Sequence, residues 1–162
     1  LEVMQCELSW ELMLGKREIF RRCFAGFDCR KVAEFDDSDV ERILAEDGMI
    51  RSERKVRAVI GNSKVFLAIV AEFGLFDSYI RSFVDNKVLV FYGKQPAESE
   101  ASRRLSADLK RRGAKFLGPV VLHSHLESFG IVMAHEPGCR KFQEFMAALP
   151  ENVAFVRGTG PY

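Results

Sequence analysis

The chain carries the sequence LSADLKRRGAKFLGPV from Leu105 to Val120. Leu105 and Leu109 lie four residues apart, so a helix would place both on one face. Gly113 predicts the end of that helix, because glycine adopts the left-handed backbone conformation without steric cost. Gly118-Pro119 predicts the start of a second helix, since proline is favoured in the first turn. The stretch is therefore typical of two helices joined by a glycine-bearing hairpin.

Basic side chains surround this hairpin. Asp108 is the local negative charge among the cations Arg103, Arg104, Lys110, Arg111, Arg112 and Lys115. Unpaired backbone N–H groups at a glycine turn or a helix N-terminus bind phosphate, and nearby cations favour the same ligand. The pattern therefore predicts a helix-hairpin-helix that binds a nucleic-acid backbone. The alternative is a solvated helix face, which is the usual role of a run of charges.

The composition indicates an ordinary soluble domain. Of the 162 residues, 48% are apolar and 29% are charged, which allows a sizeable core. The net charge of +1 excludes a general electrostatic argument for nucleic-acid binding, so that argument must rest on the local cluster. No apolar run reaches membrane-spanning length, and no signal peptide is evident. We therefore expect a cytoplasmic protein without a membrane partner.

Helical patterns fill most of the chain. The longest runs from Glu53 to Phe73 and could equally be two helices broken near Gly61-Asn62. Asp28 and Asp36 are good N-caps for two shorter helices. Residues 88–92 have the pattern of a short strand that stands alone. We predict one all-α domain over residues 1–149 and a loose tail over residues 150–162, where glycine and proline are frequent.

Cysteine usage favours reduced thiols. The chain has no CxxC pair among its four cysteines, which are Cys6, Cys23, Cys29 and Cys139. The spacing of His135 and Cys139 can place two metal ligands on one face of a helix. Pro137-Gly138 argues against a regular helix between them. An ordinary histidine and a buried thiol are the alternative.

Several short motifs, in their order and separations, resemble a known family. They include Leu8-Ser9-Trp10, Gly48-Met49-Ile50-Arg51, Ile60-Gly61-Asn62, Ser82-Phe83-Val84 and Leu109-Lys110-Arg111-Arg112-Gly113. The chain resembles the type I 3-methyladenine DNA glycosylases, members of the helix-hairpin-helix DNA glycosylase superfamily, from Leu1 to about Cys139. The resemblance implies the multi-helix fold of these enzymes. It also implies an N-terminal segment that would precede Leu1.

The resemblance implies a base-excision enzyme. It would hydrolyse the N-glycosidic bond of 3-methyladenine in double-stranded DNA after the base has left the helix stack. Glu2 is the implied catalytic carboxylate, and Trp10 and Ser124 are implied residues of the base pocket. A carboxylate accepts hydrogen bonds from the cationic base, and an indole face favours a cation. If helix continued from Glu2 to Trp10, the two would share a face. A solvated Glu2 and a core Trp10 are the alternatives.

The resemblance also assigns the contacts with DNA and a metal. Lys110, Arg111, Arg112 and Lys115 would supply charge, while backbone N–H groups near Gly113 and Gly118 position the strand. His135 and Cys139 would form half of a structural zinc site whose other two ligands precede Leu1. The chemistry itself needs no cofactor. We expect a monomer that acts on DNA with alkylated bases.

The sequence departs from the family pattern near the implied pocket. Val3 and Glu7 replace glycines, and Arg81 replaces a tryptophan. His123 and His125, which flank Ser124, occupy positions that are commonly aromatic. Since the hairpin retains the family pattern, three functions stay open: a glycosylase, a non-catalytic DNA-binding module and a helical interaction domain.

Overall fold

The structure is a computed structural model that describes residues 1–5, 8–92 and 94–159. Helices dominate the described chain, which confirms the predicted all-α class. The described chain also contains one sheet of two short strands. The chain divides into two compact units. One comprises Leu1–Phe76 with Asp108–Leu117, and the other comprises Asp77–Ala107 with Gly118–Tyr162. The sequence pattern predicts one domain over residues 1–149 and does not reveal this division.

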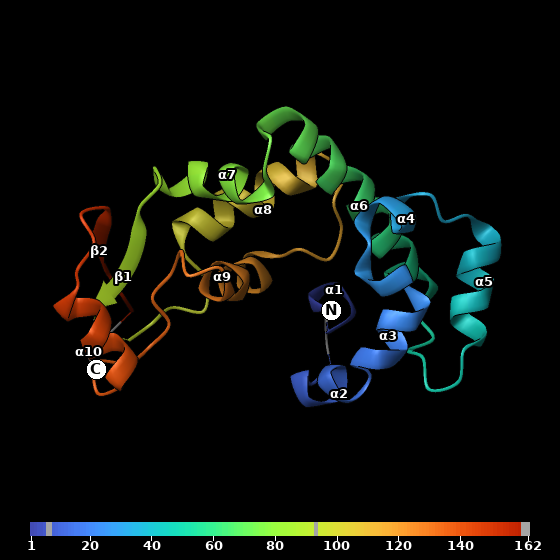
Figure 1. The fold of residues 1–162 in the computed structure, drawn as a ribbon, viewed down its shortest axis with the longest axis horizontal. Helices are drawn as coiled ribbons and strands as arrows, with labels where there is room; N and C mark the ends of the chain where they lie inside the picture. Colours follow the sequence, from blue (N-terminus) through green and yellow to red (C-terminus); the bar gives the residue numbers. More distant parts are fainter. Residues whose placement is uncertain (6–7, 93, 160–162) are drawn as a thin grey trace. The chain divides into compact units, whose positions relative to one another are not determined.

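The first unit is organised around α6 (Glu53–Phe73), which is one continuous helix of 21 residues. The alternative of two helices broken near Gly61-Asn62 is therefore wrong. α6 contacts α1 (Glu2–Gln5), α4 (Cys29–Ala33) and α5 (Asp37–Ala45), and α2 (Trp10–Gly15) and α3 (Arg17–Cys23) complete the unit (Figure 1). A short 3-10 helix, Ala25–Phe27, connects α3 to α4.

Local sequence signals set the ends of these helices. Asp28 accepts hydrogen bonds from two N–H groups in the first turn of α4. Asp36 begins α5 in a capping box, in which its carboxylate and that of Asp39 each accept from the other residue's N–H. Gly74 ends α6 with a φ of 78°. The predicted caps at Asp28 and Asp36 are confirmed.

Apolar side chains from the helices of the first unit form its core. The buried members are Met4, Met13, Phe20, Cys23, Phe24, Val32, Val40, Ile43, Met49, Val56 and Ile60. Each large apolar side chain contributes about 1.5–3 kcal/mol when it is fully buried. Lys55 is also buried, and its Nζ donates to the carbonyl oxygen of Met4 at 3.0 Å. This hydrogen bond joins α6 to α1.

The second unit contains the remaining elements. They are most of α7 (Phe76–Arg81), the 3-10 helix Ser82–Val84, β1 (Val88–Tyr92), the larger part of α8 (Glu100–Arg111), α9 (Pro119–Ser128), α10 (Arg140–Ala147) and β2 (Val153–Arg157). Leu105 on α8 is fully buried, as the apolar spacing of that helix predicts.

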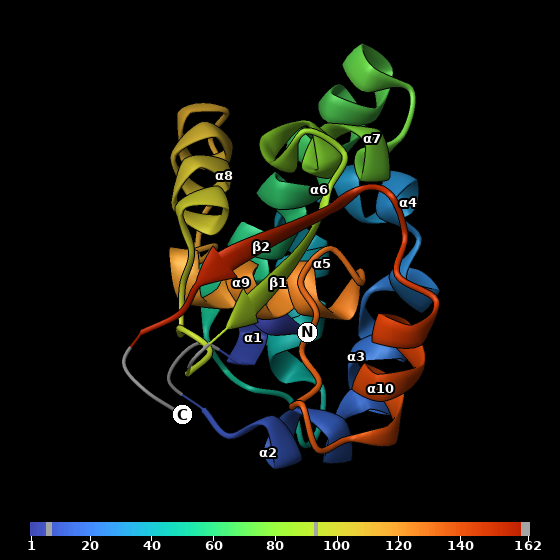
Figure 2. The same cartoon turned by 90° about the vertical axis from the view of Figure 1, so that its left-hand side faces the viewer.

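The two strands pair in parallel, with Val88 opposite Val153 and Tyr92 opposite Arg157 (Figure 2). β1 also forms a single bridge through Leu89 to Val132. The expected loose tail over residues 150–162 is therefore wrong for Val153–Arg157, and the strand at residues 88–92 does not stand alone. The reason is that a buried strand requires partners for its N–H and C=O groups, which β2 supplies from a distant part of the chain.

No single helix in the described part of the chain is long and apolar enough to cross a membrane; α6 taken with Phe76–Val84 passes that test only as a bent pair. Five residues of α6 are buried inside the protein, as expected for a core helix.

Candidate functional site

The hairpin after α8 closes with a Schellman motif. The N–H of Gly113 donates to the carbonyl of Lys110 at 3.0 Å, and the N–H of Ala114 donates to the carbonyl of Leu109 at 2.9 Å. Gly113 has a φ of 98°, which a residue with a Cβ adopts only with strain. The predicted helix stop at Gly113 is confirmed, and the reason is this left-handed conformation.

Asn62 holds the hairpin from the middle of α6. Its Nδ2 donates to the carbonyl oxygen of Lys115 at 2.9 Å, and its Oδ1 accepts from the N–H of Lys115 at 2.8 Å. The next residue, Phe116, has a φ of 58°, so the backbone is left-handed there as well. The two hydrogen bonds satisfy both backbone groups of Lys115 and fix its position in the turn.

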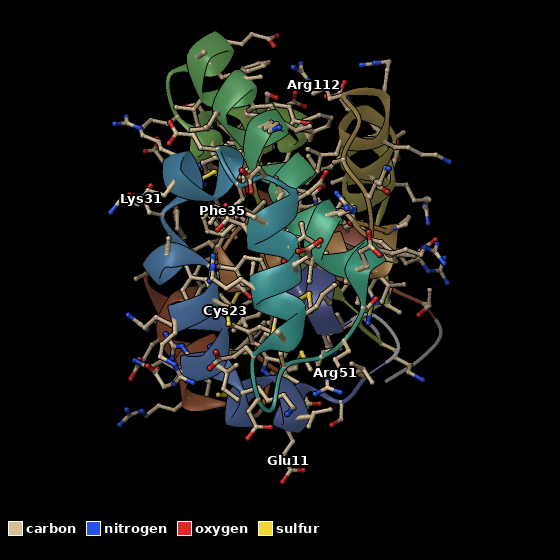
Figure 3. All side chains as sticks on the ribbon, turned by 90° about the vertical axis from the view of Figure 1, so that its right-hand side faces the viewer. Glu11, Cys23, Lys31, Phe35, Arg51 and Arg112 are labelled. Atoms are coloured by element: carbon tan, nitrogen blue, oxygen red, sulfur yellow. The ribbon has the colours of Figure 1, made fainter. Side chains whose placement is uncertain are left out.

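The cations of the hairpin are not equivalent. Arg112 donates to both carboxylate oxygens of Glu72, at 2.6 and 3.2 Å, and to Asp108 at 2.7 Å. The hydrogen bonds that Arg112 donates, first to Glu72 and then to Asp108, raise its pKa above the usual range. Its guanidinium also lies 5.6 Å from the centre of the Phe73 ring, and Figure 3 shows it at the end of α8. Arg112 is therefore compensated inside the first unit.

The other predicted contact residues are more open to solvent. Arg111 forms an ion pair with Asp108, although its own side chain is 78% exposed. Lys110 and Lys115 are exposed and have no carboxylate partner in the ranges that the structure describes. Gly118 is the N-cap of α9, and Pro119 is in the first turn, as the sequence predicts. Lys110, Lys115 and to a lesser extent Arg111 thus keep positive charge available for a ligand.

Glu2 and Trp10 lie on different helices. Glu2 begins α1, which ends at Gln5, and Trp10 begins α2, where Ser9 is the N-cap. The expectation that one continuous helix could place them on a shared face is wrong, because the helix ends after one turn. Trp10 is 44% exposed, so it is not a core aromatic residue. Glu7, which differs from the family pattern, lies outside the described residues.

The predicted pocket residue Ser124 and its neighbour His123 on α9 face different environments. Ser124 is exposed, whereas His123 is buried with 2% of its surface accessible. The Nδ1 atom of His123 lies 3.1 Å from the Ser99 hydroxyl, and its ring meets the Phe91 ring edge-on. Burial lowers the pKa of His123, while the nearby carboxylates of Glu127 and Glu98 oppose that shift. His123 is therefore a core residue of the second unit.

His135 and Cys139 approach each other as the metal prediction requires. The Sγ atom of Cys139 lies 3.7 Å from Nδ1 of His135. Helix α10 begins only at Arg140, which confirms that no regular helix connects the pair. No group of three or more histidine, cysteine or acidic side chains that could hold a metal occurs among the described residues. Two ligands do not complete the four of a structural zinc site, so these residues alone do not fit zinc.

Sequence reasoning missed Asn62 and Glu72 as partners of the hairpin. Asn62 is an amide in the interior of α6, where asparagine is disfavoured, and that placement is a signal for a specific hydrogen bond. Glu72 carries no comparable signal, since a charged residue near a helix end is common.

The fold and the hairpin define an all-helical protein of the helix-hairpin-helix class. The chain belongs to the methyladenine glycosylase family, since the sequence model of that family matches residues 1–143. The matched range ends within α10, so the end of α10 and all of β2 lie beyond it.

Characterised relatives and solved structures agree with this family. The chain is 38% identical over 143 residues to DNA-3-methyladenine glycosylase 1 of Escherichia coli, with 86% of this chain and 76% of that protein covered. It is 34% identical to DNA-3-methyladenine glycosylase of Haemophilus influenzae, with 86% of this chain and 77% of that protein covered. A crystal structure of 3-methyladenine DNA glycosylase I is similar with a TM-score of 0.76 at 36% identity, covering 86% of this chain and 79% of that chain. A variant of 3-methyladenine DNA glycosylase I in complex with 3-methyladenine is similar with a TM-score of 0.80 at 30% identity. This match covers 86% of this chain and 77% of that chain.

Proposed function

We propose that this protein is a DNA-3-methyladenine glycosylase that acts on double-stranded DNA as a monomer. The observation that carries the proposal is the family match over residues 1–143, together with relatives whose names state this activity. A structurally similar enzyme was solved in complex with 3-methyladenine, the base that the reaction releases. The reaction is the hydrolysis of the bond between deoxyribose and the alkylated base.

The chemistry requires recognition of a cationic leaving group more than strong acid catalysis. We assign Glu2 to accept hydrogen bonds from the flipped base and to stabilise its positive charge. We assign Trp10 to the wall of the pocket, where its exposed indole face suits a planar cation. Ser124, the other residue that the resemblance assigns to the pocket, is exposed on α9. Water then attacks the oxocarbenium-like sugar as the base departs, and no amine nucleophile takes part.

The hairpin has a separate task in this proposal. Lys110, Arg111 and Lys115 supply positive charge. The backbone N–H groups of Gly113, Ala114 and Lys115 already donate within the protein, so we assign the backbone contact with phosphate to the residues near Gly118. These contacts carry no sequence information, which suits an enzyme that must find a lesion in any sequence. Arg112 contributes to the shape of the hairpin through Glu72 and not by direct contact.

An excision assay tests the catalytic assignment. The wild-type protein is expected to release 3-methyladenine from DNA treated with a methylating agent. Glu2→Gln should reduce release by about 10²-fold, the usual effect of removing one electrostatic contact to a transition state. Glu11→Gln is the matched control, because Glu11 is an exposed carboxylate on α2 (Figure 3). Unchanged release by Glu2→Gln would remove Glu2 from the mechanism.

A non-catalytic DNA-binding module is the second candidate function. It is favoured by Arg81, which stands where the family has a tryptophan and forms an ion pair with Asp77 at 2.8 Å. An arginine held in this way cannot replace an aromatic surface. This function predicts DNA binding by the wild-type protein without any release of methylated base.

A further inference from the structure

A cavity of about 510 Å³ lies between the first half of α6 and the hairpin, entirely within the first unit. Its lining includes Arg54, Arg57 and Asn62 from α6, and Gly113, Lys115 and Phe116 from the hairpin. Three of the lining residues are cationic and none is acidic. The cavity therefore has the charge and the size for an anionic group.

The two arginines of α6 differ in what compensates them. Arg57 forms ion pairs with Asp37 and Glu53, each at 2.7 Å, and these carboxylates neutralise its charge. Arg54 is exposed, and its guanidinium lies 5.8 Å from the centre of the Phe116 ring. No ion pair of Arg54 occurs among the residues that the structure describes. Arg54 is therefore held beside the hairpin by an aromatic ring, which leaves its charge available.

Lys115 brings the second available charge from the opposite wall of the cavity. The Asn62 amide holds its backbone through both the N–H and the carbonyl group. The side chain itself is exposed. Because the backbone is fixed, the ammonium group loses less conformational freedom when it binds a ligand than it would from a free loop.

We propose that Arg54 and Lys115 together bind one phosphodiester group of the DNA in this cavity, and that Asn62 is a positioning residue for Lys115. This proposal rests on the proposed function, since it presumes that DNA is the partner. It adds Arg54 on α6 to the DNA-binding surface, so that the surface is formed by two segments far apart in the sequence. A phosphodiester suits this site because its single charge and two free oxygens can accept from both side chains.

The test measures affinity for an unmodified DNA duplex with a fluorescent label, over a series of KCl concentrations. Each protein–phosphate contact contributes about 0.9 to the slope of log K against log salt. Arg54→Gln and Lys115→Gln are each expected to lower the slope by about one. Arg30→Gln, which removes an exposed arginine of α4, is the matched control and should change the slope little. An unchanged slope for Arg54→Gln, with normal binding by the wild type, would overturn the proposal.

Asn62→Ala tests the positioning role. It removes both hydrogen bonds to Lys115 but no charge, and binding is measured well below the unfolding temperature so that a loss of stability does not contribute. The slope should fall partway toward that of Lys115→Gln. In the Lys115→Gln background, Asn62→Ala should have little further effect, because the charge that it positions is absent. A full additional loss in the double variant would assign Asn62 a purely structural role.

The binding test and the excision test fail independently. If the wild type binds the duplex with the expected salt slope but releases no base, the glycosylase function is wrong and the phosphodiester site stands. If excision occurs and Arg54→Gln binds as the wild type does, the phosphodiester site alone is wrong. A third outcome concerns inorganic phosphate. If Arg54→Gln binds phosphate less tightly than the wild type but binds duplex DNA equally well, the site binds a free anion and the proposed DNA contact is wrong.

Discussion

Arg112 at the end of α8 and Glu72 at the end of α6 form a two-oxygen ion pair, with the shorter distance 2.6 Å between Nη1 and Oε2. These residues are 40 positions apart in the sequence. Since Asp108 accepts from the same guanidinium, Arg112 connects α8 to α6 at the base of the hairpin. A run of basic residues that suggests one uniform surface thus contains a member with a structural role.

The ion pair predicts different effects of Glu72→Gln and Arg112→Gln on DNA binding. Glu72→Gln releases Arg112 from its strongest partner, so the salt slope of DNA binding should increase or stay constant. Arg112→Gln should lower that slope less than Lys115→Gln does. Both substitutions should lower the midpoint of urea denaturation at low salt. The difference in midpoint between each variant and the wild type should be smaller in 1 M salt, because the screening length there is only about 3 Å. Glu41→Gln, an exposed carboxylate on α5, is the control. A larger loss of slope in Arg112→Gln than in Lys115→Gln would show that Arg112 contacts DNA directly.

The turn at Gly113 predicts that a substitution there lowers the free energy of unfolding through backbone strain alone. A Cβ placed on Gly113 would meet no atom within 4 Å, but the φ of 98° is unfavourable for alanine. Gly113→Ala should therefore lower the free energy of unfolding by about 1–2 kcal/mol in urea denaturation. Gly15→Ala is the control, since Gly15 lies in α2 and a Cβ there is also free of contacts. It should be neutral or stabilise by about 0.5–1 kcal/mol. Equal effects of the two would contradict the strain at Gly113.

His123 predicts a loss of stability as the pH falls. Its pKa is lowered in the folded protein by burial, so the unfolded chain binds the proton more readily. Stability is therefore unaffected above the unfolded pKa of about 6.5 and decreases below it, at no more than about 1.4 kcal/mol per pH unit for one proton. Urea denaturation between pH 7.5 and pH 5 measures this slope. His123→Gln should reduce this slope. A slope that is equal in wild type and His123→Gln would exclude His123 as its source.

The pairing of β2 predicts that the residues beyond the family match stabilise the second unit. Val156 is half-buried, whereas Phe155 is 53% exposed. Val156→Asp should lower the free energy of unfolding by about 1–3 kcal/mol because it places a charge on an apolar face. Phe155→Asp should change it by less than about 0.5 kcal/mol, as for other surface substitutions. Equal stability of both variants and the wild type would show that this segment does not pair with β1.

Local backbone chemistry was sufficient to predict many parts of this fold. The N-caps Asp28 and Asp36 and the stop at Gly113 depend on side chains or φ values within one turn. Their signals are therefore present in a few consecutive residues. The hairpin, which is the centre of the proposed DNA contact, was predictable for the same reason.

The roles of single side chains depended on partners that are distant in the sequence. Asn62 meets Lys115 across 53 positions, and β2 meets β1 across a comparable interval. Which of the basic residues is compensated, whether His123 is buried, and whether residues 153–157 are paired all follow from such contacts. Amino-acid types restrict these pairings only weakly, because many carboxylates, amides and strands would fit equally well.

The sequence by itself determined the helical class, the family and the glycine turn of the hairpin, since each is encoded in local patterns. Only the tertiary structure decided that Arg112 is held by Glu72 while Arg54 and Lys115 keep their charge beside a common cavity. The physical reason is that the availability of a charge depends on its nearest counter-charge, and folding brings that counter-charge from elsewhere in the chain.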